Sequence, residues 1–248
     1  MTKPTDSYRK SHVGPGIGKR YDQAHAGRLD SLVWDEHVKP LLRELLAREA
    51  GLHSASRYLD FACGTGRILK QGLAFFPEGI GVDISIDMLT EARARVPGAQ
   101  LIQADVTNDS LPEQLNGMFD CVTMFRFLLN AEPELRRSVL KWLAAHMHPG
   151  AALIGNNHMC SASVGGLLTH LARTFSGSSK NVLSRKEVES LLVQAGFRIE
   201  AWHGFRVLPS LRGKPALGWW LQRRLERVAL TLGLGRFGVE QVFVARRI

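Results

Sequence analysis

Short apolar runs alternate with amphipathic stretches along most of this chain. Five runs have the length and composition of buried strands, and they cover residues 57–62, 80–83, 100–103, 119–125 and 152–156. Between them, apolar residues recur at helical spacing over 67–76, 86–95 and 133–147. Alternation of strands and helices is typical of a parallel sheet covered on both faces. The pattern therefore predicts a doubly wound α/β fold.

A further helix precedes the first strand. Apolar residues keep helical spacing over 31–49, Asp30 stands at the N-cap position and Gly51 follows the last turn. Pro40 lies inside this stretch, where proline removes a helical hydrogen bond. We expect the helix to kink or divide there.

The regular alternation of predicted strands and helices ends in the last third of the chain. Residues 161–183 are rich in serine and glycine and predict a loop or a helical lid. A helix over 184–196 is predicted because Ser184 and Glu187 form a capping-box pattern. The remaining elements are two closing strands and the insertion between them, over 197–203, 239–246 and 204–238.

These elements define the expected organisation of the chain. Residues 1–50 are interpreted as an N-terminal arm and helical cap, and residues 51–248 as the α/β core. The lid at 161–183 and the helical insertion at 204–238 interrupt that core.

Composition narrows the class of protein. The 248 residues are 45% hydrophobic and 22% charged, enough for one substantial core. Lys and Arg number 32 against 23 Asp and Glu, and the resulting charge of +9 favours an anionic partner such as nucleic acid, a membrane surface or a phosphorylated substrate. Three separated cysteines argue against a disulfide framework and a cysteine zinc site, and we predict no metal. No secretory h-region or long apolar run occurs, so we expect a cytoplasmic protein.

The candidate chemistry begins where the first strand ends. Asp60 closes that strand, and Gly64 and Gly66 form a Gly-x-Gly turn that opens a helix. Glycines allow a ligand to approach the backbone closely, and a helix N-terminus attracts an anionic group. Asp83 ends the next strand, where an acid accepts hydrogen bonds from ribose hydroxyls. Asp105 and Val106 follow the third strand, where they can bind the amino group and ring of an adenine.

This series resembles the class I S-adenosylmethionine-dependent methyltransferases of small-molecule type, over roughly residues 57–203. The resemblance implies S-adenosylmethionine as the cofactor and seven strands in the order 3-2-1-4-5-7-6. Ala62 departs from the family, because many members carry a glycine at that place. The cofactor-binding residues that it implies in this region are Asp60, Ala62, Gly64, Gly66, Asp83, Ile84, Asp105 and Val106.

The segment before the first strand adds two candidates. It resembles glycine N-methyltransferase and sugar N-methyltransferases, in which a Tyr and an Arg reach over the cofactor. Tyr21 and Arg28 stand in that place here. The alternatives are simple packing for Tyr21 and a solvated helix-start residue for Arg28.

Methyl transfer requires alignment of the acceptor with the methyl carbon, and a hydroxyl acceptor usually needs a base. We predict His158 as that base, because it ends the fifth strand at the open edge of the sheet. Its alternative role is substrate contact or structure without proton transfer. Asn130 and Arg126 follow the fourth strand. Arg126 binds an anionic substrate group in one interpretation and pairs with a carboxylate of the first helix in the other.

The segment at the end of the fourth predicted strand indicates the class of acceptor. The Asn/Asp-Pro-Pro-Tyr/Phe motif of nucleic-acid amine methyltransferases is absent, since the chain reads Phe125-Arg126-Phe127 there. We therefore expect methylation at an oxygen or nitrogen of a small molecule, with a sugar, glycan or glycolipid as the first choice, and we do not expect nucleic acid as a partner. The alternatives are an RNA methyltransferase and a non-catalytic cofactor-binding subunit. A nicotinamide enzyme would require a further glycine near Leu69.

The insertion carries a pattern of its own. Over 214–232, apolar residues keep helical spacing and two tryptophans stand beside three arginines. Such a helix suits peripheral contact with anionic lipid. The alternatives are an amphipathic helix that covers the sheet edge and a homodimer contact.

Overall fold

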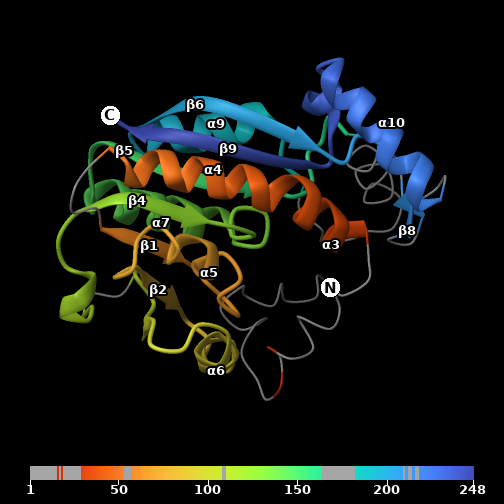
Figure 1. Ribbon diagram of the computed structural model, residues 1–248. Helices are drawn as coiled ribbons and strands as arrows, with labels where there is room; N and C mark the ends of the chain where they lie inside the picture. Colours follow the sequence, from red (N-terminus) through yellow and green to blue (C-terminus); the bar gives the residue numbers. More distant parts are fainter. Residues whose placement is uncertain are drawn as a thin grey trace, which may run out of the picture.

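A seven-stranded sheet forms the centre of the molecule (Figure 1). The computed structural model describes residues 16, 18, 29–52, 57–107, 110–163, 182–208, 210–211, 214–215 and 218–248. The strand order is β3-β2-β1-β4-β5-β9-β6, which confirms the predicted order, with β9 as the seventh strand of that sheet. The strands are β1 (Tyr58–Phe61), β2 (Ile80–Asp83), β3 (Gln100–Gln103), β4 (Phe119–Met124), β5 (Met147–Asn157), β6 (Phe197–Phe205) and β9 (Glu240–Arg247).

Strand direction places the ends of several strands together. Strands β1 to β5 pair in parallel, and β9 runs antiparallel between β5 and β6. The carboxyl ends of β1, β2 and β4 therefore meet at one edge of the sheet, which is where ligands bind in open α/β sheets.

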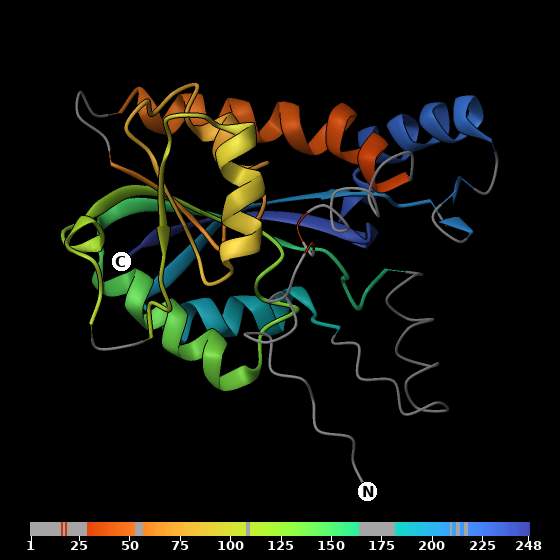
Figure 2. The same cartoon turned by 90° about the horizontal axis from the view of Figure 1, so that it is seen from below.

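Helices cover both faces of the sheet (Figure 2). Leu42 and Leu46 of α4 pack with Tyr58 on one face, while Val139 of α7 and Leu192 of α9 belong to the core on the other face. Successive side chains of a strand point to opposite faces of the sheet, so Tyr58 and Leu59 of β1 belong to the two different cores. The helices are α3 (Leu29–Val33), α4 (Lys39–Ala50), α5 (Leu69–Gly72), α6 (Ile86–Arg95), α7 (Pro133–Ala145), α9 (Arg185–Gln194) and α10 (Trp219–Thr231).

The first long helix is interrupted before Pro40, as the sequence predicts. A π-helical turn over Trp34–Val38 separates α3 from α4, and the Lys39 backbone N–H donates to the Trp34 carbonyl. The π-helical turn changes the backbone hydrogen-bond pattern just before Pro40. The helical segment can therefore include a proline, which has no N–H, while α4 continues from α3. The predicted N-cap role of Asp30 is wrong, because α3 already begins at Leu29.

Two further boundaries differ from the sequence prediction. The helix expected over 67–76 is regular only at Leu69–Gly72, with turns on both sides before Pro77. The insertion helix begins at Trp219 rather than Lys214, because Lys214–Pro215 forms β8, which pairs with β7 (Ser210–Leu211). Among the elements after 183, α9 follows the prediction closely: the Ser184 hydroxyl accepts from the Glu187 N–H, and the Glu187 carboxylate accepts from the Ser184 N–H.

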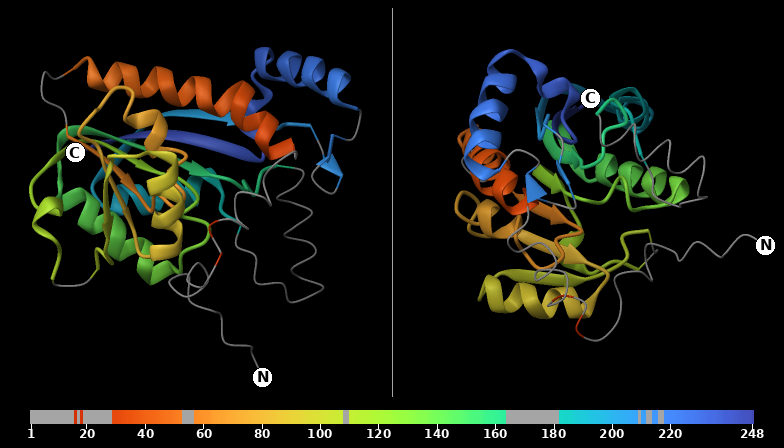
Figure 3. Two further views of the ribbon diagram at one scale, coloured as in Figure 1. Left: turned by 60° about the horizontal axis from the view of Figure 1, so that its bottom comes forward. Right: turned by 90° about the vertical axis from the view of Figure 1, so that its right-hand side faces the viewer.

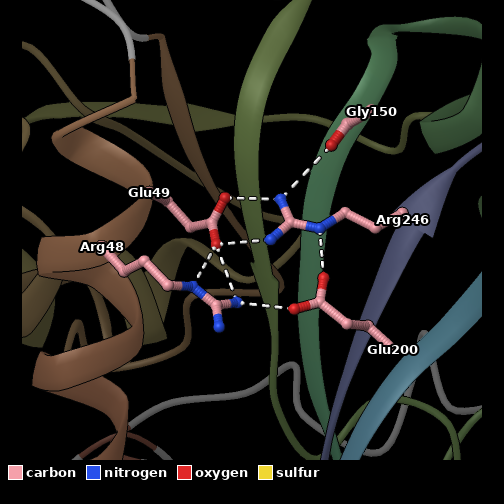
Figure 4. A network of polar contacts seen from close by, with 5 residues as sticks. All are labelled: Arg48, Glu49, Gly150, Glu200 and Arg246. Atoms are coloured by element: carbon pink, nitrogen blue, oxygen red, sulfur yellow. Dashed lines mark hydrogen bonds and ion pairs between the residues drawn. The ribbon is translucent and has the colours of Figure 1, made fainter.

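A buried ion pair between Glu49 and Arg246 connects α4 to the sheet (Figure 4). The carboxylate of Glu49, which is only 3% exposed, lies 2.6 and 2.8 Å from two guanidinium nitrogens of Arg246 on β9. Arg246 also contacts Glu200 of β6, and Arg48 bridges Glu49 and Glu200 at 3.0 and 3.2 Å. These pairs raise the pKa of Arg246 and lower the pKa of Glu200. Each ion therefore has a partner at the buried junction of α4, β9 and β6.

Candidate active site

A cavity that opens to solvent lies at the carboxyl ends of β1, β2 and β4. Most of the residues predicted to bind the cofactor or the acceptor line it, although they come from distant parts of the chain. The predicted residues on its walls are Asp60, Ala62, Gly64, Asp83, Ile84, Asp105, Val106, Arg126 and Asn130.

The loop after β1 forms one wall. Gly64 has φ = +54°, and its backbone N–H donates a 2.8 Å hydrogen bond to Asp83 Oδ2 at the end of β2. A Cβ added to Gly64 would meet no protein atom within 4 Å, so it would project into open space at the cavity wall. The loop is therefore a cradle with room for a ligand against its backbone.

The neighbouring residues of this loop have different roles. Ala62 has φ = +54°, a backbone conformation that costs an alanine roughly 1–2 kcal/mol. This conformation explains why a glycine suits that position. Gly66 does not line the cavity; its own added Cβ would lie 3.2 Å from Ala92 of α6, so it permits close packing of the loop on that helix.

Asp83 at the end of β2 and Asp105 after β3 contribute two carboxylates to the cavity wall. Asp83 accepts backbone N–H bonds from Gly64 on one oxygen and from Ser85, at 2.9 Å, on the other. A carboxylate oxygen can accept more than one hydrogen bond, so Asp83 has the chemistry to accept from ligand hydroxyls as well. Asp105 accepts from the N–H and the hydroxyl of Thr107 through Oδ1, at 3.0 and 2.6 Å. The arrangement fits a ligand that carries ribose hydroxyls and an adenine amino group.

Asp60 is the most strongly perturbed carboxyl on this wall. It is 1% exposed, and its Oδ1 accepts a 2.7 Å hydrogen bond from the Thr123 hydroxyl of β4. Burial raises the pKa of Asp60 to about 7, against the opposing hydrogen bonds from Thr123 and the Leu69 backbone, and Asp83 adds repulsion. A cationic ligand in the cavity would stabilise the ionised form.

The end of β4 holds two of the predicted catalytic residues. Arg126 has φ = +57°, and its backbone N–H donates a 2.6 Å hydrogen bond to Asn156 Oδ1 of β5. The Asn130 side chain donates to the Arg126 carbonyl at 2.6 Å. These bonds hold Arg126 in a conformation that non-glycine residues seldom adopt, as is common at binding sites.

A second, smaller cavity adjoins the first. Arg67, Phe125 and Arg126 line both, so the two share a wall. The Arg67 guanidinium lies over the Trp34 ring at 4.3 Å, and Arg206, at φ = +62°, also lines the second cavity. The described residues around it contribute three arginines and one glutamate, Glu240.

His158 takes a different position from Arg126 and Asn130. It follows the last residue of β5, Asn157, and is half-buried. It does not line either of these two cavities. Tyr21 and Arg28 lie outside the described residues, as does most of the lid predicted over 161–183.

Sequence reasoning missed two contributors. Thr123 pairs directly with Asp60 across β1 and β4, a relationship that requires the strand register. Arg67 follows Gly66 in the cradle loop, and its position immediately after the Gly-x-Gly turn was the available signal. Among the described residues, no group of three or more His, Cys, Asp or Glu side chains is placed to hold a metal ion.

Comparison with known proteins agrees with this geometry. A family model described as "Methyltransferase domain" matches residues 59–150. A dTDP-3-amino-3,4,6-trideoxy-alpha-D-glucopyranose N,N-dimethyltransferase of Streptomyces venezuelae is 35% identical over 100 residues, which are 40% of this chain and 41% of that protein. A trans-aconitate 2-methyltransferase of Methylobacterium nodulans is 29% identical over 180 residues, 68% of this chain and 67% of that protein. The matched region thus spans less than half of the Streptomyces relative.

Solved structures share the fold. Magnesium protoporphyrin IX methyltransferase from Synechocystis PCC 6803, with bound SAH, aligns at a TM-score of 0.62 and 17% identity over 97% of this chain and 98% of that one. CalS10, an amino pentose methyltransferase from Micromonospora echinaspora bound to SAM, aligns at 0.58 and 17% identity over 92% and 97%.

The sheet order, the cradle loop and the matched domain together define the class. The matched domain and the structural neighbours support a class I S-adenosylmethionine-dependent methyltransferase, and the SAM and SAH bound in those neighbours support S-adenosylmethionine as the cofactor. Its matched relatives act on small molecules.

Proposed function

We propose that this chain transfers a methyl group from S-adenosylmethionine to an oxygen or nitrogen of a small, negatively charged acceptor. The observation that carries the proposal is the cradle: the Gly64 N–H is fixed to Asp83, and the space beyond the missing Cβ is open. S-adenosylmethionine supplies a methyl group on a cationic sulfur when bound there.

The chain's own residues account for binding and alignment. Asp83 accepts ribose hydroxyls, Asp105 and the Val106 N–H meet the adenine, and the loop at 62–66 carries the methionine part. The buried Asp60 carboxyl complements the positive charge of the cofactor once it is ionised. Because the reaction is a direct displacement, the remaining task is to hold the acceptor in line with the methyl carbon.

The second cavity is the proposed acceptor site, because it shares a wall with the cofactor cavity. Its described lining of Arg67, Arg126, Arg206 and Glu240 has a net positive charge, which favours an anionic group. The names of the two sequence relatives point the same way, since a dTDP-sugar carries a diphosphate and trans-aconitate carries carboxylates. A sugar, glycan or glycolipid acceptor with an acidic group suits this site.

Proton transfer depends on the acceptor atom. An amine reacts as the neutral base and needs no catalytic base, whereas a hydroxyl needs one. We propose His158 as that base for a hydroxyl acceptor; because His158 follows β5 and lines neither cavity, this role requires an acceptor that extends beyond the second cavity to reach it. If His158 removes the proton, His158→Ala lowers turnover about 10²–10⁴-fold and removes the acidic limb of the pH profile, with little effect on cofactor affinity. A rate near that of the wild type would exclude this role.

The test is transfer of labelled methyl from S-adenosylmethionine. The full chain is incubated with a metabolite extract and, in parallel, with an RNA pool, and labelled products are identified by mass spectrometry. The proposal predicts a labelled small molecule that binds an anion exchanger, and no label with Asp83→Ala at limiting cofactor. Label in RNA alone would identify an RNA methyltransferase, and cofactor binding without any transfer would identify a non-catalytic subunit.

A further inference from the structure

Helix α10 turns its polar side toward the protein. Gln222 and Glu226 are 4% and 6% exposed, and Ala229 is buried beside them. The Glu226 carboxylate accepts backbone N–H bonds from Val207 at 2.8 Å and Leu208 at 3.1 Å. An ordinary surface helix buries its apolar stripe, so the orientation of α10 is inverted.

The apolar stripe of α10 consequently faces solvent. Leu221, Leu225, Val228 and Leu232 follow one another at helical spacing and are 38–69% exposed, and Trp220 beside them is 66% exposed. We call these five residues the α10 outer face. Leu234 and Phe237, in the short helix after α10, are also exposed. A continuous apolar surface of this kind indicates a binding partner.

Cationic side chains border the outer face. Arg224 stacks over Trp220 at 4.5 Å, and Arg227 lies one turn further along the helix. Arg223 pairs with Glu36 of the π-helical turn at 2.9 Å, which fixes α10 to the body of the protein. The single carboxylate within α10, that of Glu226, is buried on the opposite side. The outer face is therefore apolar with a positive border and no acidic residue of its own helix.

The position of α10 connects this surface to the site. The helix lies at one end of the molecule, on the same side of the sheet as α4 and away from α7 and α9 (Figures 2 and 3). A small cavity between α10 and α3 is lined by Trp219 and Gln222 on one side and Leu32 on the other. Val33 and Arg206 line both this cavity and the proposed acceptor cavity. The protein-facing side of α10 thus lies close to the proposed acceptor cavity.

We propose that the α10 outer face docks on an anionic lipid bilayer. Leucine, valine and tryptophan side chains enter the boundary between headgroups and acyl chains, while Arg224 and Arg227 contact lipid phosphates. The charge distribution favours lipid over a second copy of this chain. A twofold contact through this face would bring the same arginine borders together without a carboxylate of α10 to pair with them. Among the described residues, no helix is long and apolar enough to cross a bilayer.

The experiment is co-sedimentation of the full chain with vesicles, and it requires no methyl transfer. Vesicles of phosphatidylcholine alone are compared with vesicles containing about one third phosphatidylglycerol, at low salt and near 1 M salt, where the Debye length is about 3 Å. Two variants test the surface: Arg224→Gln/Arg227→Gln removes charge, and Leu221→Ser/Leu225→Ser removes apolar area. The matched control, Lys141→Gln/Lys186→Gln, removes the same charge from exposed positions on α7 and α9.

The proposal predicts binding to anionic vesicles at low salt that high salt weakens. The arginine variant should partition about tenfold to thirtyfold less, the leucine variant should lose binding, and the lysine control should bind as the wild type. Circular dichroism and thermal unfolding establish that each variant is folded. No sedimentation at low salt, equal loss in the lysine control, or a stable dimer that the leucine variant dissociates would overturn the proposal.

Discussion

The Gly64 N–H and the Asp83 carboxylate are joined by a 2.8 Å hydrogen bond that connects the loop after β1 to the end of β2. This bond fixes the two groups that the cofactor would contact on adjacent strands. A substitution at either residue should therefore weaken cofactor binding more than it lowers the stability of the fold.

Asp83→Ala should weaken cofactor binding by roughly 1–3 kcal/mol, because the ribose hydroxyls lose their acceptor. The measurement is the Kd for S-adenosylhomocysteine by fluorescence or calorimetric titration. Glu78→Ala, which removes an exposed carboxylate just before β2, is the control. An unchanged Kd for Asp83→Ala would remove the ribose assignment.

Gly64→Val should abolish cofactor binding while the protein stays folded. The new side chain would project into the cavity, and the positive φ would cost about 1–2 kcal/mol of stability. Gly98→Val is a matched control, since Gly98 has φ = +82° and open space around its Cβ but does not line the cavity. Addition of S-adenosylhomocysteine should raise the Tm of the wild type and of Gly98→Val. A similar rise for Gly64→Val would contradict the cradle.

Arg246→Met should lower the free energy of unfolding by about 3–5 kcal/mol, because it leaves the buried Glu49 carboxylate without its main partner. Chemical denaturation measures the change. The double variant Glu49→Gln/Arg246→Met should recover part of the loss, because no buried charge remains unpaired. Arg198→Met, at an exposed position on β6, is the control and should change stability little. Equal effects of Arg246→Met and Arg198→Met would show that the ion pair is not structural.

The raised pKa of Asp60, about 7, gives a pH dependence of defined sign. Between the unfolded pKa near 4 and the folded value, the unfolded chain loses a proton that the folded chain keeps. Stability of the unliganded wild type should therefore fall as pH rises from about 4 to 7, by up to about 4 kcal/mol, and then level off. Unfolding of wild type and Asp60→Asn across this range measures it. Identical pH profiles would place the Asp60 pKa in its ordinary range.

The sequence predicted the sheet and brought out most of the polar residues that line the first cavity, for a physical reason. Each acidic or glycine residue stands directly after a buried apolar run, so the strand that positions it is adjacent in the chain. Ser184 and Glu187 likewise define α9 locally, through a capping box that needs no tertiary information.

What the sequence did not predict depends on contacts between distant segments. Arg67, Arg126 and Arg206 meet around one cavity although they come from three separate loops. The Thr123–Asp60 bond needs the register of β1 against β4. The pattern over 214–232 indicated an apolar stripe, but only the contacts of Glu226 with Val207 and Leu208 show that the stripe faces outward.

Calorimetric titration of the full chain with S-adenosylmethionine, with NAD in parallel, tests the central claim most directly. The cavity at Gly64 and Asp83 predicts saturable binding of one S-adenosylmethionine per chain and no measurable heat with NAD. Absence of S-adenosylmethionine binding, or saturable binding of NAD in its place, would contradict the assignment of this site.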